Sequence, residues 1–160
     1  MATRKMVGLS AAATLAAALI VSFEGLALRG YRDPAGIATK CFGDTSNVVV
    51  GQRYSEAECL ASLKYQLAAH GDGVLACAPT LAGHPAQLAA SVSFAYNIGV
   101  GAFCKSSVAR RFNAGDFKAA CRAINQDDHG HPQWISAGGR ILPGLVKRRA
   151  AERALCEKDL

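Results

Sequence analysis

The first strong feature of the chain is an uncharged, mostly apolar run from Met6 to Phe23. As a helix at 1.5 Å per residue, this run would span about 27 Å, slightly less than the roughly 30 Å core of a bilayer. Ala16, Leu19, Ile20 and Phe23 recur at helical spacing, which predicts one face packed against a protein core. The pattern therefore favours a helix that suits both a membrane and a folded domain.

From Leu28 to Tyr54 the hydrophobic positions are β-branched or aromatic and alternate with turn residues, which predicts a small hairpin sheet. Its expected strand formers are Ile37, Thr39, Phe42, Val48, Val49 and Val50. A helical pattern follows, and Ser55 with Glu58 predicts a capping box at its start. The apolar face of this helix consists of Ala57, Leu60, Leu63 and Leu67. We expect it to end near His70 and Gly71.

Further helices are marked by proline, glycine and capping residues. Pro85 suits the first turn of a helix that runs to Ile98 and stops at Gly99. Residues 106–113 predict a short helix, and Asp116 is expected to cap the next one. Near the C-terminus, a Gly-Gly turn precedes a helix with Pro143 near its start. Together these patterns predict an α+β fold that is mostly helical.

Composition narrows the class of protein. The chain has 160 residues, of which 51% are hydrophobic and 19% charged, so we expect one domain with a substantial core and no disordered tail. The net charge of +6 suits an anionic partner such as cell-wall polymer, phospholipid or nucleic acid. Nucleic acid is not expected, because no known binding motif places the scattered basic residues beside aromatics.

Six cysteines are widely spaced, and no C-x-x-C pair occurs, which argues against zinc-ribbon and thioredoxin-like sites. They are Cys41, Cys59, Cys77, Cys104, Cys121 and Cys156. An even number suggests disulfides formed in an oxidising compartment; the alternative is buried thiols in a cytosolic protein. Chain spacing suggests the pairs Cys41–Cys59, Cys77–Cys156 and Cys104–Cys121.

The turn-rich stretch after the apolar run carries the strongest chemical signal. Glu24 closes the run, Asp33 lies in a polar turn beside Arg32, and Thr39 follows. Hydrolysis of a glycosidic bond needs one protonated carboxyl to release the leaving oxygen and one ionised carboxylate to activate water or attack the sugar. Partial burial of Glu24 and the polar setting of Asp33 would separate their two roles.

This segment resembles the active-site signature of glycoside hydrolase family 24, the tailed-phage lysozymes. In that signature eight residues separate a Glu from an Asp, five more separate the Asp from a Thr, and a YRDPAGI-like turn lies between the Glu and the Thr. Glu24, Asp33 and Thr39 match it without a gap. The resemblance implies that Glu24 is the general acid, that Asp33 is the general base or charge stabiliser, and that Thr39 orients water in an inverting reaction. Lys40 and Asp44 depart from the pattern, which usually has an apolar residue and a His there.

Two later segments also resemble the family. Ser91 to Phe103 is similar to its S-F-x-x-N-x-G segment, and we expect Asn97 to be a buried amide that ties helices together rather than a residue of the cleft. Trp134 to Leu155 is similar to the family's Trp, Gly-Gly, Leu-Pro-Gly-Leu, Arg-Arg, Glu ending. On an exposed helix, Arg148 or Arg149 paired with Glu152 would contribute only a few tenths of a kcal/mol.

Three interpretations of residues 1–23 remain open. A cleaved signal peptide fits the basic start and the small residues Ala16 and Ala18, but cleavage there would leave Glu24 on a frayed stub. A permanent anchor would need more Leu and Ile. We favour a weak anchor that leaves the membrane and folds into the domain, which resembles the signal-arrest-release segment of lambdoid-phage endolysins. Residues 24–160 would then form the catalytic domain.

The histidines give a weaker signal. Gln126 to His131, QDDHGH, contains metal-binding residue types, but its Gly and Pro neighbours favour a solvated loop. His70 and His84 are expected to be isolated surface residues. No metal and no organic cofactor are expected, since two carboxyls fill both proton-transfer roles.

The sequence therefore predicts a lysozyme-like fold with the active-site cleft between a helical lobe and a small antiparallel β lobe. The resemblance implies a monomeric endolysin that hydrolyses the bond between N-acetylmuramic acid and N-acetylglucosamine in peptidoglycan. It would be held in the host inner membrane through residues 6–23, then released to the periplasm. The alternatives are a lytic transglycosylase and a catalytically weak, membrane-anchored cell-wall-binding protein.

Overall fold

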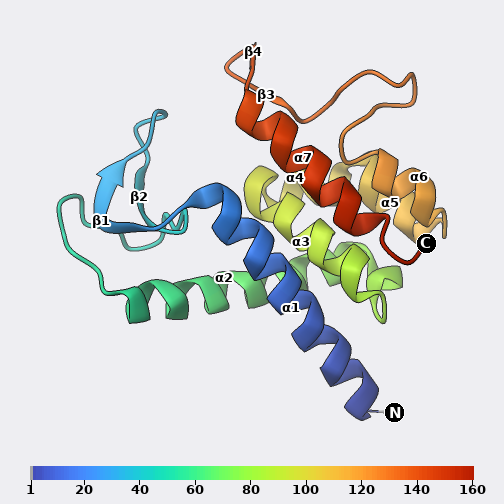
Figure 1. Cartoon of the computed structure of the whole chain (residues 1–160), viewed down its shortest axis with the longest axis horizontal. Coiled ribbons are helices and arrows are strands. Elements are labelled where there is room, and N and C mark those ends of the chain that lie inside the picture. The colour runs from blue at the N-terminus through green and yellow to red at the C-terminus, as the bar shows by residue number, and fades with distance from the viewer. Residues whose placement is uncertain (1) are drawn as a thin grey trace.

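The computed structural model describes residues 2–160, with side chains from Ser10 onward. The elements are α1 (Ala2–Glu24), β1 (Ala27–Arg32), β2 (Ala38–Cys41), α2 (Glu56–Cys77), η1 (Pro79–Leu81), α3 (Pro85–Ile98), α4 (Val100–Lys105), α5 (Ser107–Asn113), α6 (Phe117–Arg122), β3 (Ser136–Ala137), β4 (Arg140–Ile141) and α7 (Pro143–Cys156). Figure 1 shows β1 and β2 set apart on the left, with α2 running from beneath them into the group of helices. The α+β prediction is confirmed.

Helix α3 forms the centre of the helical lobe, because residues 86–95 are buried without interruption. It packs against α1, α2 and α7. Two of the polar residues within this buried segment are paired: Gln87 donates to the carbonyls of Cys156 and Lys158, and Ser93 donates to Glu152 of α7. Phe94 lies within the core of the lobe, with edge-to-face contacts to Phe103 and Trp134. The predicted bounds of this helix, Pro85 to Ile98, are confirmed.

Helix α1 joins this lobe through small and apolar residues. Ala16 and Ile20 are fully buried, and Leu19 and Phe23 are half-buried, as the helical spacing predicts. Ala12, which the sequence did not single out, is buried as well. The basic start of the chain and its first apolar residues lie outside the described side chains. Across the side chains that are described, no helix is long and apolar enough to cross a membrane.

The β lobe differs in part from the prediction. Strands β1 and β2 form an antiparallel pair in which Tyr31 lies opposite Thr39, with an irregular register near Ala27. Of the six expected strand formers only Thr39 lies in a strand. Contrary to expectation, turns and irregular segments contain Ile37, Phe42, Val48, Val49 and Val50, the last two of them exposed. The turn carbonyl of Val49 lies where a Cβ on Gly30 would be, 2.3 Å from its ideal position, so only glycine fits at residue 30.

Helix α2 begins as predicted, with Ser55 and Glu58 in a complete capping box. Its predicted end near Gly71 is wrong, because the helix continues to Cys77. Gly73 explains why glycine occurs inside a helix here: a Cβ at this position would lie 2.7 Å from Val100 Cγ1. The residue therefore permits close packing of α2 on α4 and does not end the helix.

All six cysteines form disulfides, and one of the three predicted pairs is confirmed. Cys41–Cys59 joins β2 to α2, as predicted. The other two predicted pairs are wrong, since the bridges are Cys77–Cys104 and Cys121–Cys156. The fold explains the difference: the end of α2 packs on α4, and α6 packs on α7, whatever the distance along the chain.

Candidate active site

Glu24 is the last residue of α1, where Gly25 with φ of +69° turns the chain toward β1. Its side chain is 23% exposed, so the carboxyl is partly shielded from water but still accessible. Oε1 accepts a hydrogen bond from Arg148 Nη1 of α7 at 2.5 Å. The carboxyl is therefore fixed between the β lobe and the helical lobe, as a residue at a cleft requires.

Gly43, in the turn after β2, lies directly against this carboxyl. A Cβ added to Gly43 would be 3.1 Å from Glu24 Oε2 and 3.5 Å from Glu24 Cδ. The φ of Gly43 is +81°, a conformation that L residues seldom adopt. The backbone conformation therefore favours glycine here, and any larger residue would press against the Glu24 carboxyl.

Asp33 lies in the turn that connects β1 to β2. Its Oδ1 accepts hydrogen bonds from the backbone amides of Ala35 and Ile37, at 2.9 and 2.8 Å. Arg32, which the sequence suggested as a neighbouring charge, donates instead to the carbonyl of Gly36. Within the described structure, no partner is recorded for Asp33 Oδ2, so one carboxylate oxygen is anchored and the other is available.

Thr39 lies on β2 and is 4% exposed. Its hydroxyl donates to the carbonyl of Ile37 at 3.0 Å, in the same turn that holds Asp33. With its proton used in this bond, the Thr39 oxygen can only accept a further hydrogen bond. The turn thus organises both residues through Ile37.

A hollow of about 350 Å³ lies beside Gly43, between the turn after β2, helix α2 and the end of α3. Its lining residues are Gly43, Asp44, Thr45, Ser46, Gln66, His70, Tyr96, Asn97, Ile98 and Gly99. Most of these residues carry groups that can bond to sugar hydroxyls and amides. Asn97 is exposed here, so its predicted role as a buried amide is wrong.

His70 is half-buried in the wall of this hollow, so its prediction as an isolated surface residue is also wrong. Its ring lies 5.0 Å from that of Tyr96, and its Nδ1 lies 2.7 Å from the carbonyl of Gln66. The Tyr96 hydroxyl donates to the carbonyl of Phe42 at 2.7 Å, which links α3 to the β lobe. Burial, followed by the negative charges of Glu24 and Asp44, raises the pKa of Tyr96, so its hydroxyl stays protonated.

Asp44 is a third carboxylate of this region and is only 6% exposed. Burial acts to raise its pKa, but hydrogen bonds from Ser62 and Ser46 and the charge of Lys40 outweigh burial and lower it. Ser62 Oγ lies 2.5 Å from Oδ2, and Lys40 Nζ lies 3.7 Å from the same oxygen. The two departures from the family pattern, Lys40 and Asp44, therefore contact each other.

Arg148, Arg149 and Glu152 are buried, at 3%, 0% and 0% exposure, so the small contribution given for an exposed pair does not apply. Burial raises the pKa of Glu152, against the opposing charges of Arg149 and Arg148. Burial likewise lowers the pKa of Arg149, against the charge of Glu152. Sequence spacing placed these residues on one helical face but did not show that the face is covered.

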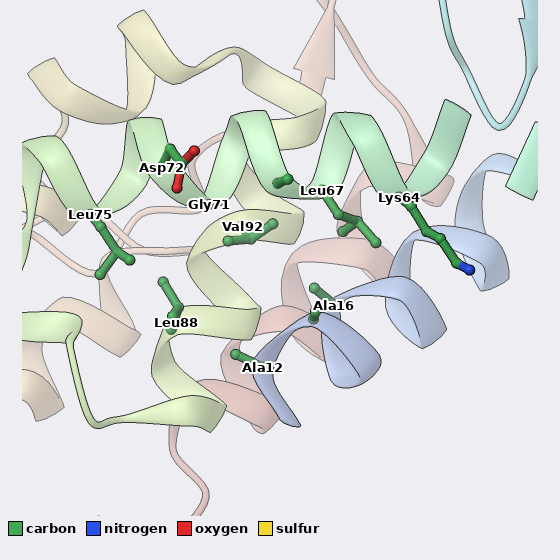
Figure 2. A pocket seen from close by; sticks show the side chains of 11 residues that line it. Ala12, Ala16, Lys64, Leu67, Gly71, Asp72, Leu75, Leu88 and Val92 are labelled. Carbon is green, nitrogen blue, oxygen red and sulfur yellow. The ribbon is translucent and has the colours of Figure 1, made fainter. Parts of the chain in front are cut away.

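A second hollow, of about 310 Å³, lies under α1 and is largely apolar. Figure 2 shows Ala12 and Ala16 of α1 across from Leu67, Leu88 and Val92. It contains no pair of converging carboxyls. Among the described residues, no group of three or more His, Cys, Asp or Glu is placed to hold a metal ion.

The predicted loop at Gln126 to His131 has its own internal bonds. Asp127 Oδ1 accepts from the backbone amides of His129 and His131. Asp128 forms an ion pair with Arg111 of α5. Both contacts agree with the solvated-loop interpretation. His84 is exposed, as expected, with its ring against Phe117.

Comparisons with known proteins agree with this arrangement. A family model described as Phage lysozyme matches residues 21–152. A SAR-endolysin of Bacteriophage PS119 is 34% identical over 139 residues, which cover 83% of this chain and 75% of the relative. A SAR-endolysin of Escherichia phage Mu is also 34% identical over 139 residues, covering 85% of this chain and 75% of the relative.

Solved structures lead to the same fold. The muramidase domain of SpmX from Asticaccaulis excentricus has a TM-score of 0.74 at 32% identity, covering 89% of this chain and 94% of that domain. The active form of the P1 phage endolysin Lyz has a TM-score of 0.76, covering 89% of this chain and 82% of that one. Its identity is 22%, so this second likeness bears on the fold alone.

Proposed function

The chain belongs to the phage lysozyme family and is a glycoside hydrolase, and from that premise we propose how it acts as an endolysin. Its substrate is the β-1,4 bond between N-acetylmuramic acid and N-acetylglucosamine in peptidoglycan. The observation that carries this proposal is the position of Glu24, with a partly exposed carboxyl fixed by Arg148 and pressed against Gly43 beside a polar hollow. The groups involved all come from one chain, which supports a monomer as the active form.

Glu24 is the general acid in this proposal. Its Oε1 accepts from Arg148, so Oε2 is the oxygen free to carry the proton. That proton passes to the glycosidic oxygen as the bond to the anomeric carbon breaks. The leaving sugar then departs as a neutral alcohol, which is the purpose of a general acid.

Asp33 and Thr39 activate the attacking water. Asp33 Oδ1 is held by two backbone amides, and Oδ2 is left to accept one proton of the water. Thr39 Oγ1 donates to Ile37 and accepts the second water hydrogen, which orients the water oxygen toward the sugar. Attack from the face opposite the leaving group inverts the anomeric carbon.

The test replaces Glu24 by Gln, which keeps the shape and removes the titratable proton. Turnover of purified peptidoglycan is expected to fall by about 10²–10⁴-fold. Asp33→Asn is expected to lose activity similarly, and Thr39→Ala to lose less, because Thr39 orients water and does not titrate. Glu157→Gln is the matched control, since Glu157 is an exposed carboxylate bound to Arg153 on α7.

Mass spectrometry of the products distinguishes hydrolysis from transglycosylation. Hydrolysis leaves reducing muramic acid ends, whereas a lytic transglycosylase leaves anhydro ends. A folded Glu24→Gln protein that clears cell-wall suspensions at the wild-type rate would contradict the assignment of the acid. Anhydro products would contradict the hydrolytic mechanism.

We further propose that residues 1–23 hold the protein in the inner membrane until α1 is released to complete the site. Two observations support this. Relatives of the chain are named SAR-endolysin, and one helix, α1, carries both Ala16 of the proposed membrane segment and the site residue Glu24. Arg4 and Lys5 would stay on the cytoplasmic side, and each would cross an inside-negative potential at about 2.3 kcal/mol per 100 mV. The membrane potential would therefore oppose release.

Fractionation before and after an ionophore tests the release. Full-length protein is expected in the inner membrane first, and then as an uncleaved, soluble protein in the periplasm. Retention in the membrane after depolarisation would contradict the proposal. If signal peptidase shortens the protein before it becomes soluble, the cleaved-signal alternative is favoured.

A further inference from the structure

The guanidinium of Arg148 is held on three sides. Nη1 donates to Glu24 Oε1, Nη2 to the carbonyl of Ser93 at 3.2 Å, and Nε to Glu152 Oε1 at 3.1 Å. The Phe23 ring lies 5.8 Å from the guanidinium carbon, within reach of a cation–π contact. Arg148 therefore has little freedom to rotate, and neither does the carboxyl it holds.

Glu152 is the residue that sets the position of Arg148 from behind. Its Oε1 accepts from Ser93 Oγ at 2.7 Å and from Arg149 Nη2 at 3.1 Å, as well as from Arg148. Its Oε2 lies 2.8 Å from Arg149 Nε. Because Glu152 is fully buried, water cannot replace any of these partners when one is lost.

The contacts join segments that are far apart in sequence. Glu24 ends α1, Ser93 lies in the middle of α3, and Arg148 and Glu152 are one turn apart on α7. Helix α3 packs against both α1 and α7. The chain from Ser93 and Glu152 through Arg148 to Glu24 thus runs from the core of the helical lobe to the cleft.

We propose that Glu152, assisted by Ser93, is a positioning residue that fixes the catalytic carboxyl of Glu24 through Arg148. This inference rests on the proposed role of Glu24 as the general acid. A general acid must hold its proton within hydrogen-bond reach of the leaving oxygen, and small displacements reduce the rate steeply. Loss of the support should therefore lower the rate of the chemical step and leave the binding of the sugar chain unchanged.

The experiment measures turnover and half-saturation on purified peptidoglycan for Glu152→Gln and Ser93→Ala in the full-length, released protein. Glu152→Gln keeps the shape but removes the charge, and the maximal rate is expected to fall about tenfold with half-saturation unchanged within about twofold. Ser93→Ala removes one hydrogen bond to Glu152 and keeps every charge. Its maximal rate is expected to fall about two- to fivefold.

Two controls separate positioning from damage to the fold. Glu157→Gln weakens an Arg–Glu pair of the same i,i+4 spacing at the C-terminal end of α7, away from Glu24, and should turn over like the wild type. Ile124→Val weakens the buried core at a residue outside the network, and its maximal rate should be unchanged well below its melting temperature. If Glu152→Gln fails to fold, Ser93→Ala decides the question.

The outcomes also distinguish this inference from the proposed function. The positioning role alone would be overturned if Glu24→Gln is inactive while the single variants Ser93→Ala and Glu152→Gln, both folded, turn over at the wild-type rate. A rise in half-saturation with an unchanged maximal rate would do the same, since it would show a loss of binding and not of positioning. An active Glu24→Gln would overturn the proposed function and the inference together.

Discussion

Helix α1 meets the rest of the protein in two different ways along its length. Between residues 12 and 16 it offers alanines to α2 and α3 and leaves a hollow of about 310 Å³ (Figure 2). At its last residue, Glu24, it is fixed by an ion pair to a buried arginine and by contact with Gly43. The same helix is thus packed loosely at one place and held closely at the other.

The difference follows from what each part of the helix does in the proposed cycle. A segment that must enter and leave a bilayer has to be only marginally apolar, and alanine satisfies this requirement at the expense of core packing. The carboxyl of a general acid has to be placed within fractions of an ångström. Charged contacts supply that placement here because they are directional, whereas alanine contacts are not.

Arg148→Met should produce the largest change, because it removes the guanidinium shared by Glu24 and Glu152. Loss of one partner from a buried ion pair destabilises a protein by about 3–5 kcal/mol. Glu157→Gln, at the C-terminal end of the same helix, weakens only a partly exposed pair with Arg153 and should cost at most about 1 kcal/mol. Urea denaturation of the two variants measures the difference. Equal losses would show that the end of α1 is not held more closely than the surface of α7.

Gly43→Ala should produce the second largest change, and its effect on turnover should exceed its effect on stability. A Cβ at 3.1 Å from Glu24 Oε2 would displace the carboxyl and lower turnover by about 10- to 100-fold. The positive φ would also cost about 1–2 kcal/mol of stability. Gly115→Ala is the matched control, since its φ is +79° and nothing lies within 4 Å of the added atom. It should lose similar stability but keep its turnover, and a parallel loss of turnover would refute the contact argument.

Acid should weaken the cleft before it affects the alanine-lined part of α1. The folded pKa of Asp44 is lowered below its unfolded value, so its contribution is full above about pH 4 and is lost as pH falls through the folded pKa. Asp44→Asn should be less stable than the wild type near pH 7, by about 1.5–3 kcal/mol for bonds to a charged group. Thermal melts at pH 7 and pH 3 should show this gap narrowing in acid. A gap that is constant with pH would mean that the charge of Asp44 is not what stabilises the turn.

Local patterns predicted the elements that local chemistry determines. Ser55 and Glu58 marked the start of α2, and Gly99 marked the end of α3, because caps and breakers act within one turn. The spacing of Ala16 and Ile20 gave the buried face of α1 for the same reason. The three candidate site residues were found through a motif, and their contacts were found only in the structure.

What the sequence missed depends on packing between distant segments. The helix was expected to end near Gly71, although it continues past Gly73, which allows close approach to Val100 of α4. Spacing alone did not show whether Glu152 is exposed, because nothing local shows that α3 covers it. Two disulfides were mispaired because chain separation does not say which helices are neighbours. His70 and Asn97 were misjudged because the hollow that they line forms between lobes.

The smallest effect expected comes from filling the hollow under α1, with Ala13→Leu compared with Ala11→Leu. Both alanines are exposed, but Ala13 lines the hollow and Ala11 does not. Both changes add the same side chain to the proposed membrane segment, so they should delay release equally, each by a few tenths of a kcal/mol of insertion energy. Only Ala13→Leu should stabilise the released enzyme, by about 0.5–1 kcal/mol, because only its side chain fills empty apolar space. Melting temperatures of the soluble proteins and lysis times in cells measure the two effects separately. Equal melting temperatures would mean that the hollow closes without added atoms, and that the alanines of α1 do not loosen its packing.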